Sequence, residues 1–277
     1  MTTTTQELKA VSAVDHSTDK APFYMEVAIM TWRDLLTTLR TPSAILPSIF
    51  INVFFLIIYK STLGRSADFL PGLEGKDYLG FILPLSVISA SLGGAGLTGQ
   101  NLVRDIESGY FNKLLLTPVS RVAIVLGPIL SGAVFLAFQA VMVIALGLLM
   151  GLNPTTGILG LAALVGLAVL TGMGLAGYIV GLALRTGNSG AVQGGSFLFF
   201  PLTFLTASYV PLDLLDGWLK TAAQLNPITY SIEAGRSLML DGWEGDTLVK
   251  GIIACGLLAI VTFAFAMSSL KARTARS

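Results

Sequence analysis

Residues 102–121 read LVRDIESGYFNKLLLTPVSR, a polar stretch between two long apolar segments. Its apolar residues recur at helical spacing and so form one face: Ile106, Tyr110, Phe111, Leu114 and Leu115. Gly109 interrupts the run, and Pro118 ends it because proline lacks the amide proton that a helix interior needs. Several charged side chains exclude most of the stretch from a bilayer interior: Arg104, Asp105, Glu107, Lys113 and Arg121. The pattern predicts a short helix at the membrane surface with one apolar side.

Periodicity alone leaves two interpretations of this short helix. Its apolar side can rest on lipid, as in an interfacial helix, or it can dock against another protein. The rest of the chain must decide between them.

The composition limits the class of protein. The chain has 277 residues, of which 53% are hydrophobic and only 12% charged. Because so few charges cannot cover a soluble globule of this size, the sequence predicts an integral membrane protein. The net charge of +1 gives no reason to expect nucleic-acid binding. Cys255 is the only cysteine, which excludes an internal disulfide and a cysteine-rich metal cluster.

Six apolar segments are near or above the roughly 20 residues that a helix needs to cross the hydrocarbon core. The predicted fold is therefore an all-α integral membrane protein. A tail at residues 1–22 is expected to be disordered, and residues 23–277 to form one transmembrane domain. That domain starts with an amphipathic interfacial helix at residues 23–40. The predicted spans are residues 45–63, 78–99, 122–150, 157–184, 191–210 and 248–270.

The distribution of Lys and Arg predicts the orientation. With both termini inside, 11 of the 17 basic residues lie in cytoplasmic segments. The positive-inside rule favours this topology, which places residues 102–121 in the cytoplasm.

Small residues are frequent inside the predicted spans, where glycine lets helix backbones approach closely. We expect packing roles for pairs such as Gly94 and Gly99, Gly147 and Gly151, and Gly177 and Gly181. Pro201 leaves the carbonyl of Phe197 without its usual donor and is expected to bend the fifth span. No span carries an ionisable side chain near its middle, which argues against a carrier coupled to protons or sodium.

The external segment, residues 211–246, is too apolar for an open loop and too interrupted to span the membrane. Its second half starts at Asn226 and Pro227, where Asn can cap the free amides and Pro suits the first turn. A helix of about 14 residues covers about 21 Å, short of the roughly 30 Å core. The segment therefore predicts a pair of helices that dips into the outer leaflet. Glu233 and Arg236 are spaced to form an ion pair there, and a direct substrate contact is the alternative.

Two ordered motifs resemble a known family. The motif E-S-G-x-x-x-K-L-L-x-x-P-x-S-R occupies residues 107–121, and N-P-x-x-Y-x-x-E-x-x-R occupies residues 226–236. Together with the amphipathic helix and six spans, they are similar to the membrane subunits of type-2 ABC exporters, in particular bacterial drug-exporter permeases of the daunorubicin type. The likeness covers nearly the whole chain after the tail.

The resemblance implies a role for several sets of residues. The first set corresponds to a coupling helix that docks on an ATPase subunit: Glu107, Ser108, Gly109, Tyr110, Phe111, Lys113, Leu114, Leu115 and Pro118. We expect its apolar members to fill a groove in that ATPase. The second set corresponds to a substrate cavity lined by the first, second and fifth spans: Asn52, Phe55, Ser86, Ser89, Phe200 and Thr203. The third set belongs to the external re-entrant helices: Asn226, Pro227, Tyr230, Glu233 and Arg236.

The expected partners follow from an absence and from the resemblance. No G-x-x-x-x-G-K-[ST] phosphate loop occurs in the sequence, so ATP and Mg are expected on a separate ATPase chain and no cofactor on this one. The resemblance implies two ATPase copies and a second permease subunit, identical or closely related, in a bacterial cytoplasmic membrane.

The expected function is ATP-driven export of a hydrophobic or amphipathic drug or lipid. An exporter of a lipid-linked glycan shares the architecture, although the proposed cavity spans lack a dense aromatic belt. A membrane assembly subunit without transport activity is a further alternative. An enzyme is disfavoured because no acid, base, nucleophile or metal ligands cluster in the spans.

Overall fold

The computed structural model describes residues 21–63, 77–206 and 215–275, which form helices and no strand. Most of the predicted tail at residues 1–22 lies outside this part of the chain. The elements are α2 (Phe23–Leu39), α3 (Pro42–Leu63), α4 (Tyr78–Glu107), α5 (Tyr110–Leu115), α6 (Arg121–Leu149), α7 (Gly157–Thr186), α8 (Ser189–Phe197), α9 (Phe199–Phe204), α10 (Gly217–Leu225), α11 (Pro227–Arg236), the π-helical turn η3 (Ser237–Asp241) and α12 (Gly245–Thr274).

Five of the described helices are long and apolar enough to cross a membrane: α3, α4, α6, α7 and α12. They coincide with five of the six predicted spans. The main difference is that α4 continues past the predicted end at residue 99 to Glu107. It does so because loss of apolar character does not end a helix, and the first helix-breaking residue on this stretch is Gly109.

The remaining predicted span, residues 191–210, is interrupted in the structure. It comprises the 9-residue α8 and the 6-residue α9, which meet at Leu198; residues 207–210 lie outside the described part. Leu198 keeps a helical backbone, with φ −60° and ψ −26°. The interruption lies where Pro201 cannot donate to the carbonyl of Phe197, and the bend that the sequence predicts there stays a prediction.

The helix α4 forms the centre of the bundle. It packs against α3, α6, α7 and α8. Of the 18 consecutive residues that make its most apolar stretch, 81% are buried, whereas the corresponding shares are 6% for α3 and 17% for α12. A Cβ atom at Gly94 or Gly99 would collide with Leu136 or Ile179. These glycines therefore have the predicted packing role, whereas Gly151 lies in a turn with φ +94° and open space around it.

The amphipathic helix α2 buries its polar side and exposes its apolar side, which is the reverse of a helix on the surface of a soluble protein. Its buried stripe is largely polar and comprises Glu26, Met30, Asp34 and Thr38. Its exposed side carries large apolar residues, among them Tyr24, Ile29 and Trp32. Because such a side is stable only against lipid or another protein, the arrangement agrees with an interfacial helix whose polar side joins the bundle.

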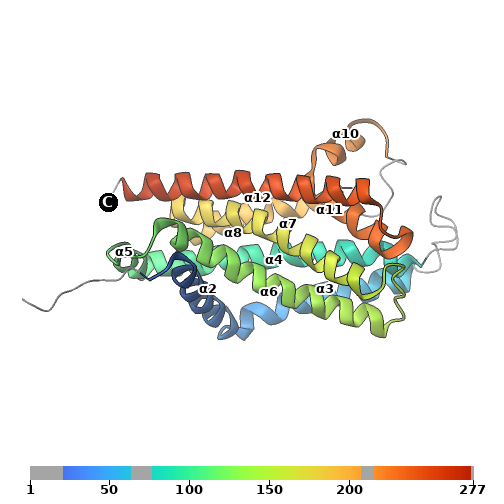
Figure 1. Ribbon diagram of the computed structural model, residues 1–277, viewed down its shortest axis with the longest axis horizontal. Helices are drawn as coiled ribbons and strands as arrows, with labels where there is room; N and C mark the ends of the chain where they lie inside the picture. The colour runs from blue at the N-terminus through green and yellow to red at the C-terminus, as the bar shows by residue number, and fades with distance from the viewer. Residues whose placement is uncertain (1–20, 64–76, 207–214, 276–277) are drawn as a thin grey trace, which may run out of the picture.

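Different helices lie at the two ends of the bundle. Figure 1 shows α5, α2 and the last turn of α12 gathered at one end, and α10 and α11 at the other. The chain therefore begins its first described helix and completes its last helix at the end that carries α5.

Candidate functional site

The site begins where α4 gives way to α5. Gly109 adopts a left-handed backbone with φ +73°, which glycine reaches without steric cost. This turn redirects the chain, so that α5 is a separate helix rather than an extension of α4. The helix ends at Leu115, before Pro118, and Ser120 then caps α6 by accepting a hydrogen bond from the amide of Ala123 at 3.2 Å.

The apolar side of α5 faces the bundle. Phe111 is 1% exposed and Leu114 is 8% exposed, and both belong to a buried cluster with Val103, Ile124 and Leu184. The expectation that these two side chains fill a groove in an ATPase is therefore wrong for this structure. The predicted apolar face exists, but its partner is the interior of the same chain, and Leu115 packs against the same cluster.

The exposed side of the turn and α5 carries a different set of residues. Glu107, Ser108 and Lys113 are exposed, and Tyr110 is 40% exposed. Asn112, Leu116 and Thr117, which the sequence pattern did not single out, are exposed as well. Leu116, which directly follows α5, is 88% exposed, the largest exposed fraction among the large apolar side chains in the described part of the chain. Its signal in the sequence was only that it lies outside the helical stripe.

An arginine on α2 holds the beginning of α5. The guanidinium of Arg33 lies 4.5 Å from the ring centroid of Tyr110, forms an ion pair with Asp105 at the end of α4 and lies 3.1 Å from the carboxylate of Asp34. Burial raises the pKa of Asp34 to about 6, although Arg33 opposes the shift. Burial lowers the pKa of Arg33, but the carboxylates of Asp34 and Asp105 more than compensate and leave it raised.

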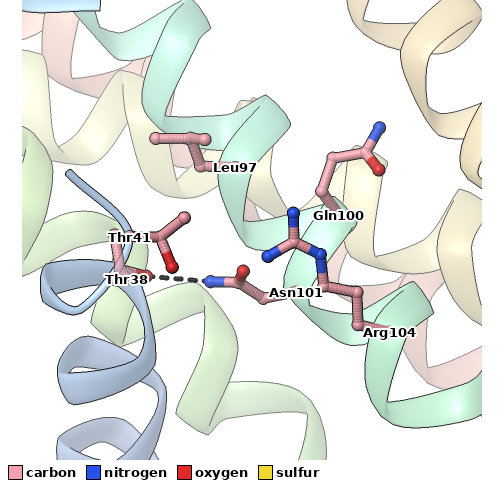
Figure 2. Close-up of a pocket in the computed structure, with 6 residues that line it drawn as sticks. All are labelled: Thr38, Thr41, Leu97, Gln100, Asn101 and Arg104. Atoms are coloured by element: carbon pink, nitrogen blue, oxygen red, sulfur yellow. Dashed lines mark hydrogen bonds between the residues drawn. The ribbon is translucent and has the colours of Figure 1, made fainter. Parts of the chain in front are cut away.

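The joint between α2 and α4 combines polar contacts with open space. The Asn101 amide donates to the hydroxyl of Thr38 at 2.9 Å, and that hydroxyl donates to the carbonyl of Asp34 at 3.0 Å. A cavity of about 170 Å³ lies beside these bonds, and Figure 2 shows the guanidinium of Arg104 directed into it. The two hydrogen bonds thus lie at the edge of incompletely packed space between α2 and α4.

A larger groove of about 680 Å³ runs beside the segment that follows α5. Glu26 lies in this groove and accepts a hydrogen bond from the amide of Ser120 at 2.9 Å. The groove extends the exposed surface of α5 towards α2 and α12. Its lining consists of Glu26, Leu115, Thr117, Pro118, Val119, Ser120, Arg121, Ile124 and Thr274.

The six candidate cavity residues do not share one environment. Ser86 is 5% exposed and donates to the carbonyl of Ile82, so it lies in the core and cannot line an open cavity in this structure. Phe55 and Phe200 are exposed on the outside of the chain.

The other three cavity candidates are partly buried. Asn52 donates to the carbonyl of Ser48 at 2.7 Å, and Thr203 donates to the carbonyl of Phe200 at 2.6 Å. Ser89 lies on α4, which packs against both α3 and α8. Five of the six candidates are thus at least partly accessible, on α3, α4 and α9.

Helix α11 begins at the predicted cap. The side-chain oxygen of Asn226 accepts a hydrogen bond from the backbone amide of Ile228 at 3.0 Å, and its side-chain nitrogen donates to the backbone carbonyl of Leu202 at 2.8 Å. Pro227 occupies the first turn of α11. The cap therefore also ties α11 to the end of the α8–α9 segment.

Two further side chains anchor α11. Tyr230 donates to the carbonyl of Gln224 at 2.8 Å. Arg236 is buried, donates to the carbonyl of Phe81 at 3.1 Å and lies 3.6 Å from the centroid of that ring. Arg236 thus joins α11 to the central helix, whereas its pairing with Glu233 stays a prediction.

Comparison with known proteins gives the family. The description "ABC-2 type transporter" belongs to a family model that matches residues 25–240. The daunorubicin resistance ABC transporter permease protein DrrB1 of Streptomyces coeruleorubidus is 24% identical over 234 residues, which cover 83% of this chain and 80% of the relative. The probable doxorubicin resistance ABC transporter permease protein DrrC of Mycobacterium tuberculosis is 23% identical over 244 residues, 87% of each chain.

A further relative, matched over a shorter part of its length, is found in Escherichia coli. Its probable multidrug ABC transporter permease YbhR is 27% identical over 166 residues, which cover 59% of this chain and 45% of the relative. The family model covers most of the described bundle, including α5 and α11. This chain therefore belongs to the ABC-2 type transporter family of membrane permeases.

Proposed function

We propose that this chain is the membrane subunit of an ATP-driven exporter and that the exposed side of α5 contacts its ATPase. Membership of the family implies an ABC ATPase subunit as partner and a multi-pass location in the bacterial plasma membrane. ATP and Mg would bind to that subunit. We infer two ATPase copies, a second permease subunit and both termini in the cytoplasm, with the α8–α9 segment as the sixth crossing and α10 and α11 as the re-entrant pair.

The observation that carries this proposal is the two-sided character of α5. Its inner side is fixed by the buried side chains of Phe111 and Leu114. Its outer side presents Tyr110, Lys113 and the exposed Leu116. A helix that is anchored inside and exposed outside moves as one piece with α4 and α6 when a partner pushes on it. Such movement would change the packing between permease subunits and so alternate the access to a central cavity.

The cargo that fits best is hydrophobic or amphipathic, and the proposed direction is outward. The accessible cavity candidates include two phenylalanines, Phe55 and Phe200, and only uncharged polar side chains. The names of the relatives, which refer to drug resistance and multidrug transport, support the same class of cargo. Export of a lipid-linked glycan is the alternative, and an assembly subunit without transport is the second.

Two exposed leucines at opposite ends of the bundle test the ATPase contact. Leu116 is 88% exposed beside α5, and Leu225 is 79% exposed at the far end. Loss of an apolar anchor at an interface typically costs about 1–2 kcal/mol, or about tenfold in affinity. We expect Leu116→Ala to reduce co-purification of the tagged ATPase by about this factor, whereas Leu225→Ala leaves it unchanged.

The same preparations test direction and cargo. Cells that carry both subunits should retain less daunorubicin than cells in which the ATPase is inactive. Equal retention would point to a lipid or glycan cargo. If Leu116→Ala and Glu107→Ala both recover as much ATPase as wild type and show the same stimulated ATP turnover, the exposed side of α5 is not the contact.

A further inference from the structure

An arginine at the end of the last helix connects α5 with α7. Arg273 lies in the last turn of α12, and its guanidinium is 5.7 Å from the ring centroid of Phe111. The same group donates to the carbonyl of Leu184 at 3.1 Å. That carbonyl belongs to the last turn of α7, where carbonyls have no partner within the helix. One side chain of α12 thus contacts two other elements, α5 and α7, that are far apart in the sequence.

The turn that follows α7 leaves space for this arginine. Gly187 ends α7 with a left-handed backbone, φ +58°. A Cβ atom at this position would lie 3.0 Å from a guanidinium nitrogen of Arg273 and 3.4 Å from a methyl carbon of Ile106 on α4. A side chain at residue 187 would therefore displace Arg273 as well as strain the backbone. α4, α7 and α12 meet at this turn.

The position of the turn determines the position of α8. Asn188 caps α8 by accepting from the amide of Ala191 at 2.9 Å, and the hydroxyl of Ser189 donates to Gln100 of α4 at 2.5 Å. α8 then leads without a loop into α9, which carries Phe200 and Thr203, two of the cavity candidates. A displacement at residue 187 would therefore reach the proposed cavity wall through α8 and α9.

We propose that Arg273 is a positioning residue that transmits movement of α5 to the α7–α8 turn and from there to the α8–α9 segment. This role rests on the proposed function of α5 as the ATPase contact. The cation–π contact keeps Arg273 over Phe111, and the charge-assisted hydrogen bond keeps it on α7. When α5 moves, Phe111, Arg273 and the end of α7 move together. A cap with only a structural role would stabilise α7 without making α8 respond to nucleotide.

A label on α8 tests the role without knowledge of the cargo. Phe197 is 68% exposed at the end of α8, so Phe197→Cys in a Cys255→Ser background gives this chain one site for an environment-sensitive fluorophore, which is attached before the complex is assembled. In the complete complex in nanodiscs, we expect ATP with vanadate to change its emission. Arg273→Gln should reduce that response at least about fivefold, the scale of typical coupling between sites. ATPase recovery and basal hydrolysis should stay near wild type.

Matched variants separate transmission from charge and from strain. Lys271→Gln removes a positive charge from the same last turn, on an exposed side chain. Gly187→Ala and Gly157→Ala place alanine at φ +58° and +62° at the two ends of α7, but only residue 187 lies against Arg273. We expect similar losses of thermal stability for the two alanine variants and loss of the nucleotide response for Gly187→Ala alone.

The outcomes distinguish this role from the proposed function. A full response in Arg273→Gln, or equal responses in Gly187→Ala and Gly157→Ala, would overturn the transmission role while leaving the ATPase contact intact. The transmission role would also be overturned if, with Arg273 in place, the emission of the label did not change with ATP and vanadate in an active complex. Failure of the wild-type chain to recover the ATPase would instead overturn the proposed function. Should Arg273→Gln not assemble, the two glycine variants decide.

Discussion

Replacing Phe111 with alanine should destabilise the permease itself, with or without its ATPase. The ring is 1% exposed within the single chain, and removal of a buried phenylalanine side chain typically costs about 3–5 kcal/mol. At about 2–4 °C per kcal/mol for a chain of this size, the unfolding midpoint should fall by roughly 6 to 20 °C. Tyr110→Ala is the control: that ring is 40% exposed and loses a cation–π contact worth about 0.5–1 kcal/mol.

The chain contains its own reporter for this measurement. Cys255 is the only cysteine and is buried, so a thiol-reactive fluorophore reports unfolding of the purified chain in detergent. We expect Phe111→Ala to unfold well below wild type in the absence of the ATPase, and Tyr110→Ala to unfold within a few degrees of it. A wild-type midpoint for Phe111→Ala, combined with loss of the ATPase, would restore the groove-filling interpretation and refute the internal position of the ring.

Two further predictions concern α2 and the α8–α9 segment. Because burial raises the pKa of Asp34 to about 6 from an ordinary 3.8, the folded chain holds this proton more tightly than the unfolded chain, so wild type should lose stability as pH rises from about 4 to 6. Asp34→Asn should flatten this dependence and raise the midpoint at pH 7.5, and an unchanged slope would contradict the assignment. Pro201→Ala restores a donor for the carbonyl of Phe197 and should straighten the segment. Spin labels at Ser189→Cys and Phe204→Cys, in a Cys255→Ser background, should then lie farther apart, and an identical distance would exclude proline as the cause of the bend.

Hydropathy and local breaking signals predicted much of the architecture. Five predicted spans coincide with long helices because burial in lipid demands an uninterrupted apolar run, which is visible in one dimension. The break at Gly109 and the cap at Asn226 also followed from single residues whose backbone preferences are local.

The sequence did not show what each side of a helix packs against. The stripe with Phe111 and Leu114 has the same spacing whether it meets an ATPase or the permease core, and only the fold decides. The same holds for Asp34, a charged residue that lies on the buried side of α2. The contact of Arg273 with Leu184 joins residues 89 positions apart and has no local signal at all.

The uneven burial of the helices has a consequence for how such a chain adapts. A Cβ atom at Gly94 or Gly99 of α4 would collide with a neighbouring helix, whereas Phe55 of α3 and Phe200 of α9 are exposed within the chain. Random substitutions will therefore be purged from the centre and tolerated on the two segments that carry Phe55 and Phe200. Selection for a new cargo can act on those segments while the scaffold stays intact. The architecture separates the residues that keep the protein folded from those that are free to diversify.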